Sequence, residues 1–370
     1  MAQAPPRDLR ALGARFQILG TQVAAAPYGS GHINETYAAT YDQAGTPVRY
    51  IHQRINGHVF REPERLMDNV ARVLTHAATR LAHLPDASRR ALTLVPARDG
   101  RPFVVDADGA VWRTYLFIER TRTYDIVETP QQAEAAARAF GAFQAQVADL
   151  PGERLHDTIP DFHHTRRRFD AFVRAVDGDP CNRAQGCREL IDQLLAHEAD
   201  ADRLLAAAAA GDIPERVTHN DTKINNVMID VASGEALCVV DLDTTMPGLA
   251  PIDFGDMVRT ATNAAAEDEP DASRVASRPE MFEALVRGYL SSAGDFLRPA
   301  EVAWLAFAGQ LLAFEQAIRF LADHLQGDTY YRVHRQHHNL ERARAQVALM
   351  TSIERQRDAY EAVVRRYARG

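Results

Sequence analysis

The sequence has little cysteine, no long hydrophobic run and no excess of positive charge, and each absence excludes something. The three cysteines, Cys181, Cys187 and Cys238, do not make a disulfide framework and suit a reducing compartment. The longest uncharged apolar run, about 302–314, is shorter than the roughly 20 residues that a membrane-spanning helix needs. The first residues, MAQAPPRDLR, contain no apolar signal core. We therefore expect a cytoplasmic protein with no membrane partner.

Negative charge exceeds positive charge. The 42 Lys and Arg residues stand against 50 Asp and Glu residues, for a formal net charge of −8. A nucleic-acid-binding protein usually carries a basic balance or a basic face, so this charge argues against a nucleic-acid partner. The chain has 370 residues, of which 46% are hydrophobic and 25% charged. These values are typical of a globular protein with two or three domains, or with two lobes that share one site.

The first third of the sequence predicts a small β-rich lobe. Its β-rich runs are separated by glycine, aspartate and proline, as in antiparallel hairpins. One segment between them has apolar residues at helical spacing. We expect strands over 16–26, 33–41, 48–55, 102–106 and 110–118, and a helix over 62–83.

The rest of the chain is rich in Ala, Leu, Glu and Arg, which favour helices. A strand-like segment over 217–243 interrupts this part, and 264–280 is expected to be a mobile surface connection. We therefore predict an α+β fold with lobes over 1–117 and 118–370. The expected helices cover 131–150, 165–176, 188–210, 280–291, 299–325 and 336–366.

The interrupting segment carries the residues suited to chemistry. It reads VTHNDTKINNVMID and then LCVVDLDTTMPG. Asp221 is followed by Lys223 and Asn226, and a predicted strand then leads to Asp241, with Asp243 behind it. Carboxylate and amide oxygens suit Mg²⁺ rather than zinc. A further carboxylate can accept a hydroxyl proton, and a lysine can neutralise a phosphate oxygen. Phosphoryl transfer requires these parts.

The spacing of HNDTKINN, residues 219–226, resembles the catalytic loop H-x-D-x-K-x-x-N of the protein kinase-like superfamily. The segment VVDLDTT lacks the Phe-Gly that follows the metal-binding aspartate of protein kinases, and it resembles the aminoglycoside phosphotransferase-like family of small-molecule kinases. Within that family the chain looks most like N-acetylhexosamine 1-kinases. The supporting stretches run in order through nearly the whole chain: YGSGHINETY, YIHQRIN, WRTYLFIE, THNDTKINNVMID, VVDLDTTMPG and RFLADHLQGDTYYRVHRQHHNLERARAQ.

The resemblance implies roles in the catalytic segment. Asp221 would be the catalytic base, Lys223 would neutralise the transferring phosphate, and His219 would support the loop. Asn226 and Asp241 would bind Mg²⁺. Asp243 would be either a further metal ligand or a residue beside the ligands.

The resemblance also implies an ATP site between the lobes. Gly29, Ser30 and Gly31 would cover the phosphates, although Asn34 stands where a third glycine is usual. The adenine would lie against the backbone near Phe117 and Glu119.

The third strand departs from the family pattern because it has no lysine. Arg54 is nearest to the position of the phosphate-binding lysine, and a guanidinium can hold two phosphate oxygens. Either Gln53 or Arg54 would face the nucleotide, since a shift of one residue turns a strand side chain to the other face. The acidic partner from the following helix would be Asp68 or, less favoured, Glu64.

The resemblance points to the acceptor site as well. Arg319 and Tyr330 would contact a sugar, and His32 and Asn34 would reach the same cleft. The basic run 166–168 is expected to be an exposed helix start.

Together these features predict a monomer or weak homo-oligomer that uses ATP and Mg²⁺ to phosphorylate the anomeric hydroxyl of an N-acetylhexosamine. The alternatives are another small acceptor (an aminoglycoside, choline or a muramic sugar), a nucleotide-binding pseudokinase, or a metal hydrolase built on His219, Asp221, Asp241 and Asp243.

Overall fold

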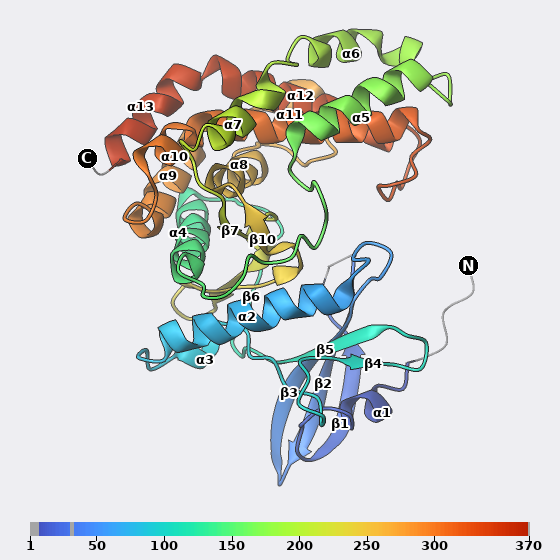
Figure 1. Ribbon diagram of the computed structural model, residues 1–370, viewed down its shortest axis with the longest axis vertical. Helices are drawn as coiled ribbons and strands as arrows, with labels where there is room; N and C mark the ends of the chain where they lie inside the picture. The colour runs from blue at the N-terminus through green and yellow to red at the C-terminus, as the bar shows by residue number, and fades with distance from the viewer. Residues whose placement is uncertain (1–6, 30–32, 369–370) are drawn as a thin grey trace.

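A small sheet lobe and a larger helical lobe make up the protein, with α2 (Pro63–Leu81) between them (Figure 1). The computed structural model describes residues 7–29 and 33–368. The strands are β1 (Thr21–Pro27), β2 (Glu35–Gln43), β3 (Thr46–Arg54), β4 (Val104–Val105), β5 (Val111–Leu116), β6 (Thr121–Arg122), β7 (Arg216–Thr218), β8 (Val227–Asp230), β9 (Ala236–Val239) and β10 (Met246–Gly248).

The helices lie mostly in the second lobe. The longer ones are α4 (Pro130–Val147), α5 (Thr165–Gly178), α6 (Arg188–Leu195), α7 (Asp200–Ala209), α8 (Ala250–Ala261), α9 (Pro279–Ala293), α11 (Leu305–Leu325), α12 (His338–Arg355) and α13 (Arg357–Tyr367). The short helical turns are α1 (Leu9–Gly13), α3 (Ala87–Arg90), η1 (Ala184–Cys187), η2 (Ile224–Asn226), η3 (Leu242–Thr244), η4 (Ala272–Arg274) and α10 (Pro299–Ala303). The predicted α+β fold with a small sheet lobe and a larger helical lobe is confirmed.

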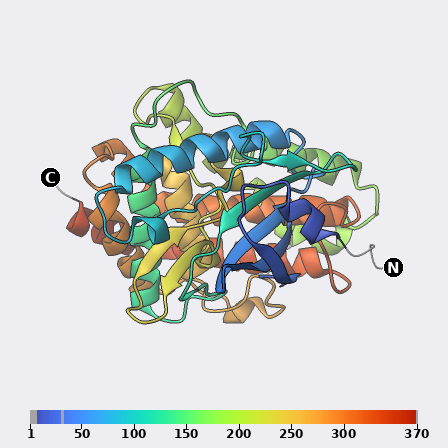
Figure 2. The ribbon, with the colours of Figure 1, turned by 90° about the horizontal axis from the view of Figure 1, so that it is seen from below.

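The sheet of the small lobe is antiparallel, with strand order β1-β2-β3-β5-β4. One face packs with α1 around a small core that includes Phe16, Tyr50 and Trp112. On the other face, Tyr115 joins the buried face of α2 and a core that continues through the helical lobe. Figure 2 shows α2 running across the molecule beside this sheet. The two lobes therefore share one apolar core, which limits how far they can separate.

Helix α11 is the one helix of the described residues that is long and apolar enough to cross a membrane. However, 83% of its most apolar window is buried inside the protein. It packs against α5, α8 and α12 (Figure 1). The same composition is expected of a helix at the centre of a helical lobe.

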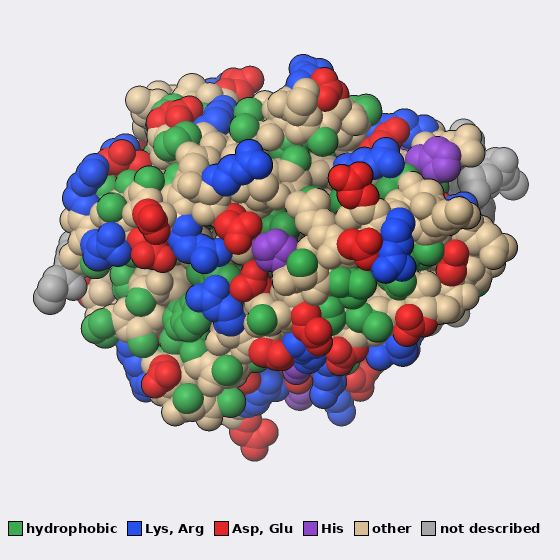
Figure 3. Space-filling view, turned by 90° about the horizontal axis from the view of Figure 1, so that it is seen from above, with side chains coloured by type: hydrophobic (Ala, Val, Ile, Leu, Met, Phe, Trp, Pro, Cys, Tyr) green, Lys and Arg blue, Asp and Glu red, His purple; other side chains and the backbone are tan. Residues whose placement is uncertain are grey.

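The helical lobe differs from the sequence expectation in three ways. The segments 188–210, 299–325 and 336–366 are each broken into two helices. Helix α8 was not predicted at all, although it directly follows the motif segment. The connection over 264–280 includes η4 and is tied to the lobe by ion pairs of Glu267 with Arg259 and of Asp268 with Arg335. Figure 3, the view from above, shows acidic and basic side chains interspersed on the face of this lobe.

Candidate active site

The loop between β7 and η2 carries His219, Asp221 and Lys223. Asn220 has a φ of +64°, a conformation that asparagine tolerates better than most residues, and it turns the chain there. The His219 ring is fully buried against Phe140 and Phe143, and its Nε2 lies 2.9 Å from the carbonyl oxygen of Val240. His219 therefore joins the loop to the strand that leads to Asp241, as a supporting residue would.

Helix α8 holds the same loop in place through the carboxylates of two aspartates. The carboxylate of Asp253, which is fully buried, accepts hydrogen bonds from the backbone N–H groups of His219 at 2.8 Å and Asn220 at 2.7 Å. One turn later, Asp256 accepts a hydrogen bond from the N–H of Thr222 at 2.9 Å. Sequence analysis missed both aspartates. Their spacing of three residues, which places them on one helical face, was the available signal.

The carboxylate of Asp221 is held by two neighbours. Lys223 Nζ lies 2.8 Å from Oδ1, and Asn226 Nδ2 donates to Oδ2 at 3.1 Å. Burial alone would raise the pKa of Asp221, but Lys223, His219 and Asn226 together lower it below its usual value. In turn, Asp221 raises the pKa of Lys223. The pair is therefore ionised at neutral pH.

Asn226 and Asp241 lie side by side at the ends of paired segments. The N–H of Val240 donates to the carbonyl oxygen of Asn226 at 2.9 Å, and Asp241 follows with a φ of +59°. Desolvation and the nearby carboxylates of Asp243 and Asp221 raise the pKa of Asp241 to about 7. Among the described residues, no hydrogen bond or ion pair reaches the Asp241 carboxylate. Because Asn226 donates through Nδ2, its Oδ1 is left as an oxygen donor, and the two side chains fit a hard divalent cation such as Mg²⁺.

The carboxylate of Asp243, in contrast, binds residues of the sheet lobe. It forms a buried ion pair with Arg113 of β5, and its Oδ2 accepts a hydrogen bond from Asn34 Nδ2 at 2.6 Å. Gln53 Oε1 accepts from Arg113 Nε at 2.9 Å and from Nη2 at 2.7 Å. The structure thus gives Asp243 a place beside the proposed metal ligands. Sequence analysis missed Arg113 because its partners come from segments far apart in the chain.

The position predicted for Arg54 needs correction. Arg54 lies on the other face of the sheet, where its Nη1 pairs with Glu35 at 2.8 Å. Gln53 is the residue of β3 that faces α2 and Arg113, since neighbouring strand residues point to opposite faces. The structure does not bring Arg54 to the acidic cluster.

The acidic partner expected from α2 is also absent from this cluster. Asp68 is 50% exposed and lies near Arg72 and His156, and Glu64 is exposed as well. Met67 is the α2 residue that approaches Arg113, with its sulfur 4.0 Å from Nη1. Asn69 of α2 instead donates hydrogen bonds to the carbonyl oxygens of His156 and Thr245, which joins α2 to the helical lobe.

The glycine-bearing turn joins β1 to β2. Gly29 has a φ of +84°, which favours glycine, whereas the predicted contacts Ser30, Gly31 and His32 lie outside the described residues. The end of the turn is fixed to the chain after β3, where Asn56 N–H donates to Asn34 Oδ1 at 3.0 Å. Asn34 therefore lies beside Asp243, with both ends of its side-chain amide bound.

The segment after β5 leads to β6, which pairs with β8 of the helical lobe. The ring of Phe117 contacts Tyr28 at a centroid distance of 5.4 Å, and the Arg49 guanidinium lies 3.7 Å from the ring centroid. The Glu119 side chain pairs with Arg49. The N–H of Ile118 and the carbonyl of Phe117 make no hydrogen bond with another described residue, so they offer a donor and an acceptor to a planar base.

The predicted acceptor residues lie on the helical side of the loop. His163 bridges to the loop, with Nε2 3.0 Å from the Asn220 carbonyl oxygen and Nδ1 2.7 Å from Glu315. Arg319, one turn after Glu315, is 10% exposed, and its guanidinium lies 5.9 Å from the Tyr331 ring centroid. Tyr330 is 64% exposed. The Tyr331 hydroxyl is buried and has no hydrogen-bond partner among the described residues.

Two acceptor-side features escaped the sequence analysis. Arg168 is half-buried rather than exposed at a helix start, and burial together with Arg319 lowers its pKa. Asp323 accepts hydrogen bonds from the backbone N–H groups of Thr329, Tyr330 and Tyr331, at 2.8 to 2.9 Å. This carboxylate fixes the segment that carries the two tyrosines.

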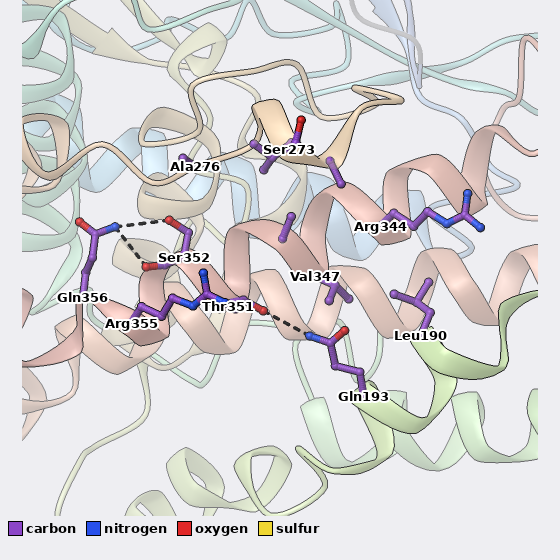
Figure 4. Close-up of a pocket in the computed structure, with 13 residues that line it drawn as sticks. Leu190, Gln193, Ser273, Ala276, Arg344, Val347, Thr351, Ser352, Arg355 and Gln356 are labelled. Atoms are coloured by element: carbon purple, nitrogen blue, oxygen red, sulfur yellow. Dashed lines mark hydrogen bonds between the residues drawn. The ribbon is translucent and has the colours of Figure 1, made fainter.

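A large cavity of about 620 Å³ lies elsewhere, between α6, η4 and α12 (Figure 4). Its polar side chains bond one another, as Gln193 Nε2 does with Thr351 Oγ1 at 3.3 Å. It contains none of the residues of the loop, so it is separate from the candidate active site.

Comparison with known proteins agrees with this fold. The model of the phosphotransferase enzyme family matches residues 24–302, which is more than half of the chain. An aminoglycoside phosphotransferase from Alicyclobacillus acidocaldarius has a TM-score of 0.61 at 13% identity, over 99% of this chain and 98% of that one. A spectinomycin phosphotransferase in complex with ADP and spectinomycin has a TM-score of 0.56 at 12% identity, over 96% and 99%. A microcompartment-associated aminopropanol kinase has a TM-score of 0.53 at 17% identity, over 95% and 98%. At these identities the three structures show a shared fold.

Proposed function

The chain belongs to the phosphotransferase enzyme family, and we propose that it transfers the γ-phosphate of Mg-ATP to the anomeric hydroxyl of an N-acetylhexosamine. The observation that carries the proposal is the position of Asp221, ionised and held beside Lys223, Asn226 and Asp241. Asp221 would orient the sugar hydroxyl and accept its proton. Lys223 would offset charge on the phosphate oxygens, and a Mg²⁺ ion on Asn226 and Asp241 would supply further charge neutralisation. We place this enzyme in the cytoplasm.

The use of lysine in the sequence supports this role of Lys223. It is the single lysine among the 42 basic residues of the chain, and the other 41 are arginines. An ammonium group is a compact charge on a flexible stem, whereas a guanidinium is a planar fork. A lysine at this position is expected if a compact positive charge must follow the phosphate during its transfer.

Charge on the acceptor side supports a sugar over a cationic acceptor. The carboxylate of Glu315 is already bound by His163 and Thr165, and Glu267 is paired with Arg259. Arg319 forms a long ion pair of 4.0 Å with Glu315 but makes no hydrogen bond with another described residue, so its N–H groups are available to sugar hydroxyl or acetamido oxygens. A choline-like or aminoglycoside acceptor would instead meet a guanidinium.

The first experiment is a panel of acceptors with Mg-ATP, followed by phosphorus NMR. N-acetylglucosamine and N-acetylgalactosamine should give 1-phosphates, and choline, ethanolamine and an aminoglycoside should give no product. A 6-phosphate product would refute transfer to the anomeric position while leaving a sugar kinase. A preference for a cationic acceptor would refute the sugar assignment.

The variant Asp221→Asn tests the catalytic assignment. Turnover should fall by about three orders of magnitude or more, because the amide accepts no proton and orients the hydroxyl poorly. Binding of Mg-ADP, measured by calorimetry, should persist. Near-normal turnover of this variant would overturn the assignment, and a wild type that binds nucleotide without phosphorylating any acceptor would favour a pseudokinase.

A further inference from the structure

Arg113 is the cation of the sheet lobe that lies nearest to the proposed metal ligands. Its side chain is 1% exposed, and its N–H groups are shared between Gln53 on one side and Asp243 on the other. A buried arginine is costly unless it is paired and hydrogen-bonded, and here both conditions are met. The guanidinium therefore binds these two partners and is too buried to contact a ligand directly.

The sheet lobe has no lysine that could bind the nucleotide phosphates, since the single lysine of the chain is in the helical lobe. Nor does α2 provide an acid: Met67 faces Arg113, while Glu64 and Asp68 face solvent. Arg54, the candidate from the sequence, is engaged by Glu35 on the opposite face. The only buried ion pair between the two lobes near Asp241, among the described residues, is Arg113 with Asp243.

Both oxygens of Asp243 are used by the sheet lobe. One pairs with Arg113, and the other accepts the hydrogen bond from Asn34 at the end of the glycine-bearing turn. Asp243 lies two residues after Asp241 on η3, so a movement of Asp243 is passed through a short, buried segment to Asp241. Asn34 also accepts from Asn56, which fixes it to the chain after β3.

We propose that Arg113 is a positioning residue that acts through Asp243, fixing Asp241 for the metal and, through Asn34, fixing the end of the phosphate-covering turn. The proposal rests on the proposed function only in taking Mg-nucleotide as the ligand. Arg113 does not touch the nucleotide. Through Asp243 it sets the relative position of Asp241 in the helical lobe and Asn34 in the sheet lobe.

Nucleotide binding measured by calorimetry, with Mg²⁺ and with EDTA, separates this role from simple structural support. The variants are Arg113→Met, Arg113→Lys, Asp243→Asn and Asn34→Ala, with Arg101→Met as a control on an exposed arginine of the same lobe. Arg113→Met and Asp243→Asn should weaken ADP binding about tenfold in Mg²⁺, within the range of coupling between contacting residues. They should weaken it less in EDTA, where only the effect through Asn34 remains. Arg113→Lys should fall between, because one ammonium group cannot span Gln53 and Asp243.

Asn34→Ala changes only a partly buried residue, so it tests the contact with Asp243 even if the buried variants fail to fold. Alone it should weaken Mg-ADP binding, and normal binding by this variant would overturn the proposal. Its effect on Mg-ADP binding should be non-additive with that of Asp243→Asn, so that the double variant binds no worse than Asp243→Asn alone. Equal weakening in Mg²⁺ and EDTA, additive effects of the two changes, or a loss on Arg54→Met with none on Arg113→Met would each overturn the proposal. A failure of the proposed function would appear instead as a wild type that binds Mg-ADP normally and phosphorylates no sugar.

Discussion

Replacing Asp253 tests whether α8 holds the catalytic loop in place. The carboxylate accepts three hydrogen bonds, from the N–H groups of His219 and Asn220 and from Gln144 Nε2 at 2.6 Å. In Asp253→Asn, the best orientation places the new NH₂ group against the Asn220 N–H, so two donors face each other. A buried donor without a partner costs ~1–3 kcal/mol, and the two remaining hydrogen bonds lose their charge assistance. We expect the free energy of unfolding to fall by ~2–4 kcal/mol.

The same change should also lower turnover, because the loop carries Asp221. A misplacement of ~1 Å at a reacting group can cost about a hundredfold in rate. The measurements are guanidinium unfolding, and turnover at a temperature where the variant is folded. Asp212→Asn, on an exposed aspartate of the same lobe, is the matched control and should change neither quantity. A variant Asp253→Asn with wild-type turnover and stability within ~0.5 kcal/mol of wild type would refute the anchoring role.

Two further predictions concern single titrating groups. Because Asp221 raises the pKa of Lys223, amine acylation at about pH 8 should be slow at Lys223 and faster in Asp221→Asn. Mass spectrometry of the peptide that contains Lys223 measures this rate separately from acylation of the α-amino group, and the chain has no other lysine. Equal rates would contradict the ion pair. Burial lowers the pKa of His163, but the carboxylate of Glu315 raises it by more, so the net shift is upward. The stability that this ion pair contributes is therefore present below about pH 6.5 and is lost as the pH rises through the folded pKa. The free energy of unfolding lost in His163→Gln should therefore be larger at about pH 6 than at about pH 9, and a loss that grows with pH would contradict the pairing.

The residues that sequence analysis placed well belong to short segments. His219, Asp221, Lys223 and Asn226 lie within eight residues, where chain connectivity alone keeps them together. Asp241 comes just after β9, which pairs with β8, the strand that directly follows this loop. Local spacing therefore predicts this part of the site without knowledge of the tertiary fold.

The residues that it misplaced depend on strand faces and on distant segments. A difference of one residue separates Gln53 from Arg54, and the two side chains point to opposite faces of the sheet. Arg113 acquires its role only when β5 lies beside β3 and the η3 segment packs beneath both. Asp253 and His163 reach the loop from positions more than 30 residues away. The helical spacing of Asp253 and Asp256 indicates a shared face, but it does not indicate which segment that face contacts.

The three carboxylates of the cleft indicate how the site divides its charges. Asp221 is paired with Lys223, and Asp243 is paired with Arg113, so each of these carboxylates has its own protein cation. Asp241 has none among the described residues, and its pKa rises to about 7 through desolvation and the two neighbouring carboxylates. A carboxylate in this position gains most from a cation that arrives from outside the chain. Because Lys223 and Arg113 pair with the other two carboxylates, Asp241 is the one of the three that would gain most from the proposed Mg²⁺.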